Sequence, residues 1–152
     1  WEPRGLIEAE HRPLRGTTVS AAEAAGIIDE LPVLMVAAAC AEGVTRLEGL
    51  GELRVKETDR IRSMVEGLRR LGAQVQETGA DEVRITGGRL TGATVESAGD
   101  HRTAMSLAVA GLIARGQTLL RGAECVSKSF PGFFDALGAV AGSSTVKTVD
   151  SA

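Results

Sequence analysis

The chain has 152 residues, 43% of them hydrophobic and 24% charged, which is enough to bury a core in one domain or two small subdomains. A net charge of −3 gives no basic footprint for nucleic acid, and no partner of that class is expected. The longest apolar run, residues 31–41, has about half the length needed to span a bilayer, so no membrane segment is expected. Two cysteines do not make a disulfide framework and fit a cytoplasmic setting.

The first predicted element is a strand within residues 5–14, which follows Trp1 almost directly and indicates a piece of a longer protein. Residues 27–42 then predict a helix that is hydrophobic almost all round and therefore buried. Gly43 ends this helix, and the sequence VTRLEGL after it predicts a strand.

Residues 58–71 predict an amphipathic helix, because apolar residues recur there every three or four positions and Gly72 follows directly. The segments AQVQET and DEVRITG then predict two strands of a hairpin, joined by a short turn. The next segment, GATVESAG, is interpreted as a further strand or a loop.

The same order of elements then returns. A second buried helix is predicted at 101–116, a strand at 117–123 and an amphipathic helix at 131–142, before a polar end with a short strand. Asp29 lies 14 residues before Gly43, as Arg102 lies 14 before Gly116, and both second helices end in Leu-Gly-Ala. These matches indicate an internal duplication with a period near 73 residues.

The predicted fold class is therefore α/β, built from repeated units with helices packed inside. Each unit has the order α-β-α-β-β with one strand before it, and the two repeats cover approximately residues 13–88 and 89–146.

Polar residues occupy matching places in the two repeats, at the predicted starts of helices. The cations Lys56, Arg60, Arg102 and Lys128 stand where the helix dipole disfavours positive charge by a few tenths of a kcal/mol each. A shared anionic ligand explains such a placement, because Arg and Lys side chains grip carboxylate and phosphate groups. The carboxylates Asp29 and Glu57 lie among them and are candidates for proton transfer.

Ordinary structural roles compete with this interpretation. Asp29 is also a candidate helix N-cap, and for Asp100, before the second buried helix, capping is the favoured role. Glu57 and Arg60 are three residues apart, the spacing of a surface ion pair. His101 stands beside Arg102 at a helix start and favours a functional role. On the residues alone, an anion site and a solvated helix face both remain open.

Four motifs carry a family resemblance, in order from about Pro13 to Ala141: IIDELPVLMVAAACAEG, LRVKETDRI, GDHRTAMSLAVAGL and SKSFPGFFDALGA. Together they resemble the C-terminal part of the 5-enolpyruvylshikimate-3-phosphate synthases. The resemblance implies an enolpyruvyl transferase fold of βαβαββ units around buried parallel helices, arranged like an inside-out α/β barrel. It also implies that residues 1–152 are a fragment of the C-terminal domain and that the first domain is absent.

The implied reaction belongs to aromatic amino-acid biosynthesis, the shikimate pathway. It transfers the enolpyruvyl group of phosphoenolpyruvate to the 5-hydroxyl of shikimate 3-phosphate and releases phosphate, with no metal or organic cofactor. Its partners would be these two substrates and the missing first domain, and the complete enzyme is expected to be a monomer.

The resemblance also implies roles for single residues. Asp29 matches the proposed base for the shikimate hydroxyl, and Glu57 matches the residue for proton transfer at the phosphoenolpyruvate methylene. Lys56 matches a lysine on the shikimate side. The phosphoenolpyruvate site, where glyphosate also binds in this family, is matched by Arg60, His101, Arg102 and Lys128.

Three alternatives are weaker on the residues. The transferase acting on UDP-N-acetylglucosamine has an ENR-type stretch and a DLRA stretch where this chain has KETDR and DHRTAM. A non-catalytic half-enzyme that serves as a binding module is disfavoured because the full polar set is present. An RNA-cyclase-like protein of related fold is disfavoured by the acidic balance.

Overall fold

The computed structural model describes residues 5–6, 8, 10, 12–142 and 145–149. Two open sheets form within this part of the chain: a four-stranded sheet of order β1-β2-β4-β3 and a two-stranded sheet of β5 and β6. The pairings β1–β2 and β5–β6 are parallel, whereas β4 pairs antiparallel with β2 and β3. The strands are β1 (Thr18–Val19), β2 (Val44–Leu47), β3 (Gln74–Glu77), β4 (Val83–Thr86), β5 (Thr94–Glu96) and β6 (Leu119–Arg121).

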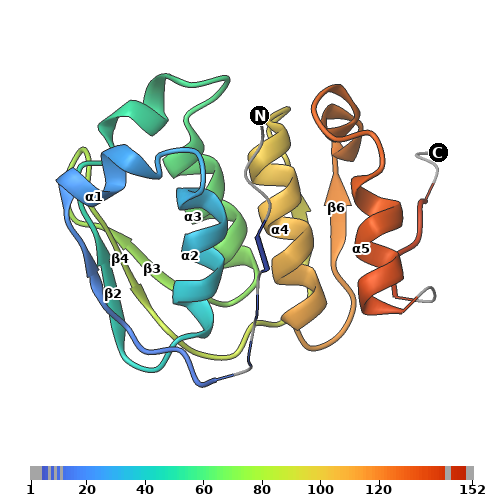
Figure 1. Cartoon of the computed structure of the whole chain (residues 1–152), viewed down its shortest axis with the longest axis horizontal. Helices are drawn as coiled ribbons and strands as arrows, with labels where there is room; N and C mark the ends of the chain where they lie inside the picture. Colours follow the sequence, from blue (N-terminus) through green and yellow to red (C-terminus); the bar gives the residue numbers. More distant parts are fainter. Residues whose placement is uncertain (1–4, 7, 9, 11, 143–144, 150–152) are drawn as a thin grey trace.

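Helices fill the space between and beside the sheets. Three of them, α2, α3 and α4, lie side by side in the middle of the molecule, with the larger sheet on one side and β6 with α5 on the other (Figure 1). The predicted α/β class, with packed helices inside, is confirmed. The helices are α1 (Ala21–Gly26), α2 (Leu31–Cys40), α3 (Arg60–Arg70), α4 (His101–Ile113) and α5 (Phe133–Ala141), with 3-10 helices η1 (Gly51–Val55) and η2 (Ala123–Lys128).

Helix α3 illustrates how the sequence pattern becomes packing. Its apolar stripe, which includes Ile61 and Met64, is fully buried, while Arg62 and Glu66 form an exposed pair on the other face. The Asp59 side chain accepts a hydrogen bond from the backbone N–H of Arg62 and so caps the first turn. Gly72 ends the helix at φ +86°, a left-handed conformation that glycine adopts without steric cost.

The predicted hairpin is also confirmed. Strand β3 pairs with β4 in the register Gln74↔Thr86 to Glu77↔Val83. Val75, Val83 and Ile85 alternate with exposed residues and turn their side chains into the core, which is the period of a half-buried strand. This core continues through Leu47, the α3 stripe and Leu107 of α4.

Several sequence expectations are corrected. The helix predicted over 27–42 is shorter: only Leu31–Cys40, helix α2, is helical in that range, because residues 27–30 form a turn that separates it from α1. Helix α2 is also less buried than its all-round apolar pattern predicts, since Val33 is 44% exposed. No strand occurs at residues 5–6, 8, 10 and 12–14 or at 145–149. A segment with strand-like residues forms a strand only where a partner strand pairs with it.

The same backbone geometry recurs at a spacing of 73 residues. Gly43 and Gly116 have φ +90° and +92°, and Gly49 and Gly122 have φ +72° and +69°. Gly43 and Gly116 follow helices α2 and α4, and Gly49 and Gly122 precede the 3-10 helices η1 and η2. The repeat bounds 13–88 and 89–146 themselves stay a prediction.

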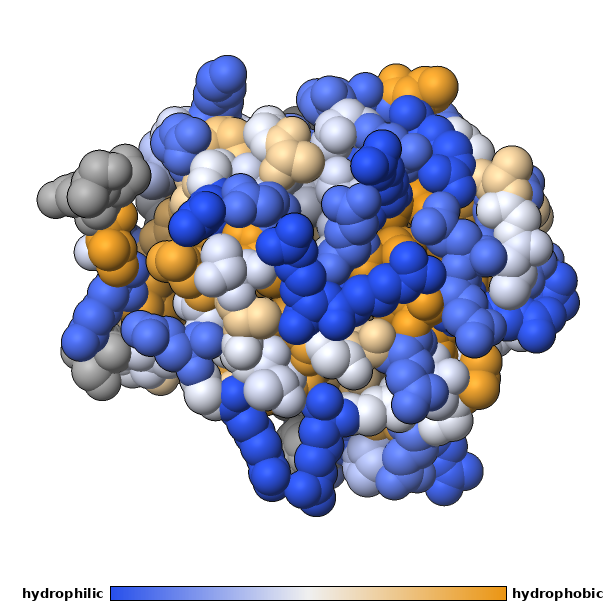
Figure 2. All heavy atoms as spheres, turned by 180° about the vertical axis from the view of Figure 1, so that it is seen from behind, coloured by the Kyte–Doolittle hydropathy of each residue, from blue (hydrophilic) through white to orange (hydrophobic). Residues whose placement is uncertain are grey.

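The surface is mixed in character. Figure 2 shows a face on which hydrophilic residues predominate and apolar residues are visible between them. Among the described helices, none is both long and apolar enough to cross a membrane.

Candidate functional site

The starts of three helices meet at one end of the molecule. Helices α2 and α4 run parallel, because Arg102 at the start of α4 contacts Asp29 just before α2, while Cys40 and Ile113 at their other ends line one pocket. Helix α3 begins at the same place, since its first residue, Arg60, also bonds to Asp29. Free N–H groups and partial positive charge therefore converge where the candidate residues lie.

Arg60 is the centre of this cluster and is only 2% exposed. Its Nε and Nη2 donate to the two carboxylate oxygens of Asp100 at 3.1 and 3.0 Å, in a bidentate pair. Asp100 is fully buried, so the pair is removed from water. Two buried opposite charges in this geometry compensate each other's desolvation, whereas either one alone would be costly.

The two candidate proton-transfer groups bind two of the three remaining N–H donors of the same guanidinium. Arg60 Nη1 donates to Asp29 Oδ1 at 3.0 Å, and Nη2 also donates to Glu57 Oε2. The side chains of Asp29 and Glu57 are 42% and 54% exposed, so both carboxylates face solvent as well as Arg60. One buried cation thus orients two accessible acid–base groups.

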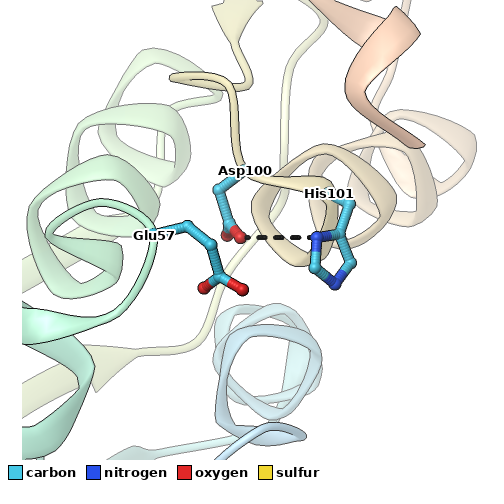
Figure 3. Close-up of side chains that lie close together, drawn as sticks. All are labelled: Glu57, Asp100 and His101. Atoms are coloured by element: carbon cyan, nitrogen blue, oxygen red, sulfur yellow. Dashed lines mark ion pairs between the residues drawn. The ribbon is translucent and has the colours of Figure 1, made fainter. Parts of the chain in front are cut away.

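Arg102 and His101 approach the cluster from α4. Arg102 Nη1 donates to the backbone oxygen of Asp29 at 2.9 Å, and its Nη2 lies 3.3 Å from Asp29 Oδ2. His101 Nδ1 lies 3.9 Å from Asp100 Oδ1. Figure 3 shows Glu57, Asp100 and His101 grouped around one point, with Glu57 reaching across from the loop before α3.

The two lysines of the predicted set behave differently. Lys56 follows η1 and forms an ion pair with Glu52. It directly precedes Glu57, which binds Arg60. Lys128 is exposed at the end of η2 and forms no ion pair with another described residue. Since η2 packs against α4, Lys128 belongs to the same part of the fold, but the structure does not bring it into the Arg60 cluster.

Glu57, Asp100 and His101 each have a ligand atom within 4.8 Å of the others, a spacing that would suit a metal ion. The bonding of Asp100 argues against one. Its Oδ2 already accepts from Arg60 Nε, Thr103 N and Thr103 Oγ1, and its Oδ1 accepts from Arg60 Nη2. Arg60 supplies the positive charge that a metal would bring, so these residues do not fit a resident ion.

The protonation of the central pair follows from these contacts. Burial by itself raises the pKa of Asp100, but the bonds from Arg60 and Thr103 outweigh it and hold the pKa below its ordinary value. Burial by itself lowers the pKa of Arg60, but the carboxylates of Asp100 and Glu57 outweigh this effect and hold the pKa above its ordinary value. Both groups are therefore charged at neutral pH.

Two alternatives from the sequence are now corrected. Asp29 is not the cap of α2, because Glu30 occupies that position and makes no side-chain cap bond. Arg60 and Glu57 do pair, but Arg60 is buried and the interaction is not a surface ion pair. The expected capping role of Asp100 is confirmed by its bond from Thr103 N. What sequence reasoning missed is that the same carboxylate holds Arg60, a contact across 40 residues of chain.

This arrangement can hold an anion and move protons. It offers the partly exposed guanidinium of Arg102 beside two accessible carboxylates, at helix starts that favour negative ligands. The family model for EPSP synthase (3-phosphoshikimate 1-carboxyvinyltransferase) matches residues 1–137. The chain belongs to this family. The resemblance inferred from the four sequence motifs is thereby confirmed.

Individual relatives agree with the family model. A 3-phosphoshikimate 1-carboxyvinyltransferase from Roseiflexus sp. is 51% identical over 140 residues, which are 92% of this chain and 32% of that protein. A solved EPSP synthase from Acinetobacter baumannii superposes with a TM-score of 0.79 at 42% identity, over 86% of this chain and 31% of its own. The enolpyruvyl transferase NikO from Streptomyces tendae, at 22% identity and a TM-score of 0.67, shares the fold. The chain spans about a third of the curated relatives it matches.

Proposed function

We propose that this chain forms one wall of an active site for enolpyruvyl transfer from phosphoenolpyruvate to shikimate 3-phosphate. The single observation that carries the proposal is the Arg60 cluster, in which one buried guanidinium orients Asp29 and Glu57 beside Arg102. Membership of the EPSP synthase family selects this chemistry among the reactions that such a cluster could serve.

The proposed mechanism assigns one task to each group. Asp29 accepts the proton of the 5-hydroxyl as its oxygen bonds to C2 of phosphoenolpyruvate, and Glu57 delivers a proton to the methylene carbon C3. In the elimination, Glu57, now a carboxylate, takes a proton back from C3, the C2–O bond to phosphate breaks as the C2=C3 double bond forms again, and the proton held by Asp29 leaves with the phosphate. Arg60, His101, Arg102 and Lys128 stabilise the carboxylate and phosphate charges of phosphoenolpyruvate, and Lys56 contacts the shikimate side.

The rest of the active site is assigned to a further domain of the same protein. The chain corresponds to about a third of its relatives, so we propose that phosphoenolpyruvate and shikimate 3-phosphate bind between this wall and the first domain. Such an enzyme would work as a monomer in the cytoplasm, where the free thiols Cys40 and Cys125 stay reduced. Turnover by the chain alone is expected to be negligible.

A graft tests this function. The 140 residues of this chain that align with the Roseiflexus relative replace the corresponding third of that protein. Phosphate release is measured with both substrates, with either one alone, and with UDP-N-acetylglucosamine as acceptor. We expect release only with phosphoenolpyruvate and shikimate 3-phosphate together. Glu57→Gln in the graft should lower kcat by about 100-fold or more, the usual contribution of a general acid.

A folded graft without turnover would contradict the proposal and favour a non-catalytic binding module. Turnover with UDP-N-acetylglucosamine instead of shikimate 3-phosphate would assign the other transferase activity. Folding is checked by a cooperative thermal melt of the graft next to the parent enzyme.

A further inference from the structure

Asp100 stands outside the set of residues that carry the proposed reaction, yet it has the most restricted environment in the cluster. It is fully buried, and both carboxylate oxygens are occupied by Arg60 and Thr103. We propose that Asp100 is a positioning residue, which sets the plane of the Arg60 guanidinium and joins α3 to the start of α4. The kinetic part of this inference rests on the proposed function, whereas its structural part does not.

The geometry of the pair shows how the positioning works. A guanidinium is a rigid planar fork, so a bidentate bond through Nε and Nη2 fixes both its position and its rotation. Once that edge is held by Asp100, the Nη1 donor points to Asp29 and the free hydrogen of Nη2 points to Glu57. The location of two accessible carboxylates thus depends on a third that solvent does not reach.

Asp100 also ties Arg60 to α4. Its Oδ2 accepts from Thr103 N at 2.9 Å and from Thr103 Oγ1 at 2.8 Å, which caps the helix that carries His101 and Arg102. Arg102 in turn reaches Asp29 on the far side of Arg60. One carboxylate therefore sets the spacing between the two arginines that would hold an anionic substrate.

The turn that delivers Asp100 is specifically built. Ala98 and Gly99 both have positive φ, +55° and +75°, and for Ala98 this left-handed conformation is sterically unfavourable. Buried Ser97 holds the turn, because its Oγ donates to the backbone oxygen of Gly122 at 2.8 Å and accepts from Gly99 N at 3.0 Å. A strained turn that is secured by partly buried hydrogen bonds is characteristic of a functional constraint.

The variant Asp100→Asn removes the charge at nearly constant shape, and asparagine still caps α4. Asp59→Asn is the matched control: Asp59 also caps a helix and also pairs with an arginine, but that arginine is Arg54. The first measurement is exchange of the Arg60 Nε–H proton by NMR, in the chain itself and without substrate. We expect Asp100→Asn to accelerate this exchange by about tenfold or more and Asp59→Asn to leave it unchanged.

The second measurement is steady-state kinetics of the graft described above. We expect Asp100→Asn to raise KM for phosphoenolpyruvate by about tenfold, with little effect on KM for shikimate 3-phosphate. A role in folding alone would lower the amount of active enzyme, and therefore the apparent kcat, without changing either KM.

The outcomes separate the two proposals. Unchanged Arg60 exchange in Asp100→Asn would overturn the positioning role whether or not the graft is active. Accelerated exchange with an unchanged KM for phosphoenolpyruvate in an active graft would overturn its link to substrate binding. An inactive wild-type graft would count against the proposed function only, and the exchange measurement would then decide the structural claim by itself.

Discussion

Replacing Arg60 with methionine tests the energetic importance of the buried pair. The variant keeps a long apolar stem in α3 but leaves Asp100, which is fully buried, without its counter-charge. Asp29 and Glu57 are about half exposed and remain solvated, so most of the cost arises at Asp100. Removing one partner of a buried ion pair costs about 3–5 kcal/mol.

The matched control lies in the same helix. Arg62 is 73% exposed and pairs with Glu66 at i,i+4, so Arg62→Met should cost no more than about 0.5 kcal/mol. In urea unfolding followed by circular dichroism, Arg60→Met should therefore lose several kcal/mol more than Arg62→Met. In a thermal melt this difference of about 2.5–5 kcal/mol corresponds to a fall in Tm of about 5–20 °C.

A double variant distinguishes the uncompensated charge of Asp100 from general misfolding as the cause of the lost stability. Adding Asp100→Asn to Arg60→Met removes the uncompensated charge and should restore more than about 1 kcal/mol of the loss. If Arg60→Met were no more destabilising than Arg62→Met, or if the double variant gained nothing, Asp100 would not depend on Arg60 for its charge.

Two further predictions concern Asp100 and the turn before it. The pKa of Asp100 is lower in the folded chain than its ordinary value of 3.8, so its stabilising contribution is complete above that value and is lost as the pH falls below it. The free energy of unfolding in urea, measured from pH 6 down to pH 2.5 in steps of about half a pH unit, should fall in the wild type as Asp100 is protonated. In Asp100→Asn it should depend less on pH over the same range. Ala98→Gly should raise the free energy of unfolding by about 0.5–1 kcal/mol, because glycine adopts φ +55° without strain; a destabilised variant would contradict a strained turn.

Local sequence signals were sufficient for the long periodic elements. Helix α3 and strands β3 and β4 were predicted correctly, because the spacing of their apolar residues is that of an element with one face buried against a core. Helix α1 was missed although Ser20 and Glu23 form a capping box, the signal that would have revealed it. The strand expected at 5–14 was wrong within the described residues, because strand formation depends on a partner that local sequence does not specify.

The candidate site was predictable only in part. The position of each charge relative to a helix start follows from helix signals, so Asp29, Glu57, Arg60 and Arg102 could be selected from the sequence. The sequence could not predict which carboxylate would neutralise which arginine. Spacing indicated Glu57 for Arg60, whereas the fold adds Asp29 and Asp100, which lie 31 and 40 residues away along the chain.

The sequence by itself determined the family, the α/β class and the residue types that gather at the helix starts, because these depend on motifs and on local periodicity. Only the tertiary structure decided that Arg60 is buried and that Asp100, apparently a simple helix cap, is its main partner. The physical reason is that burial and ion pairing depend on which segments pack together. A charge changes from a solvated group to the centre of a site when distant helices exclude water from it.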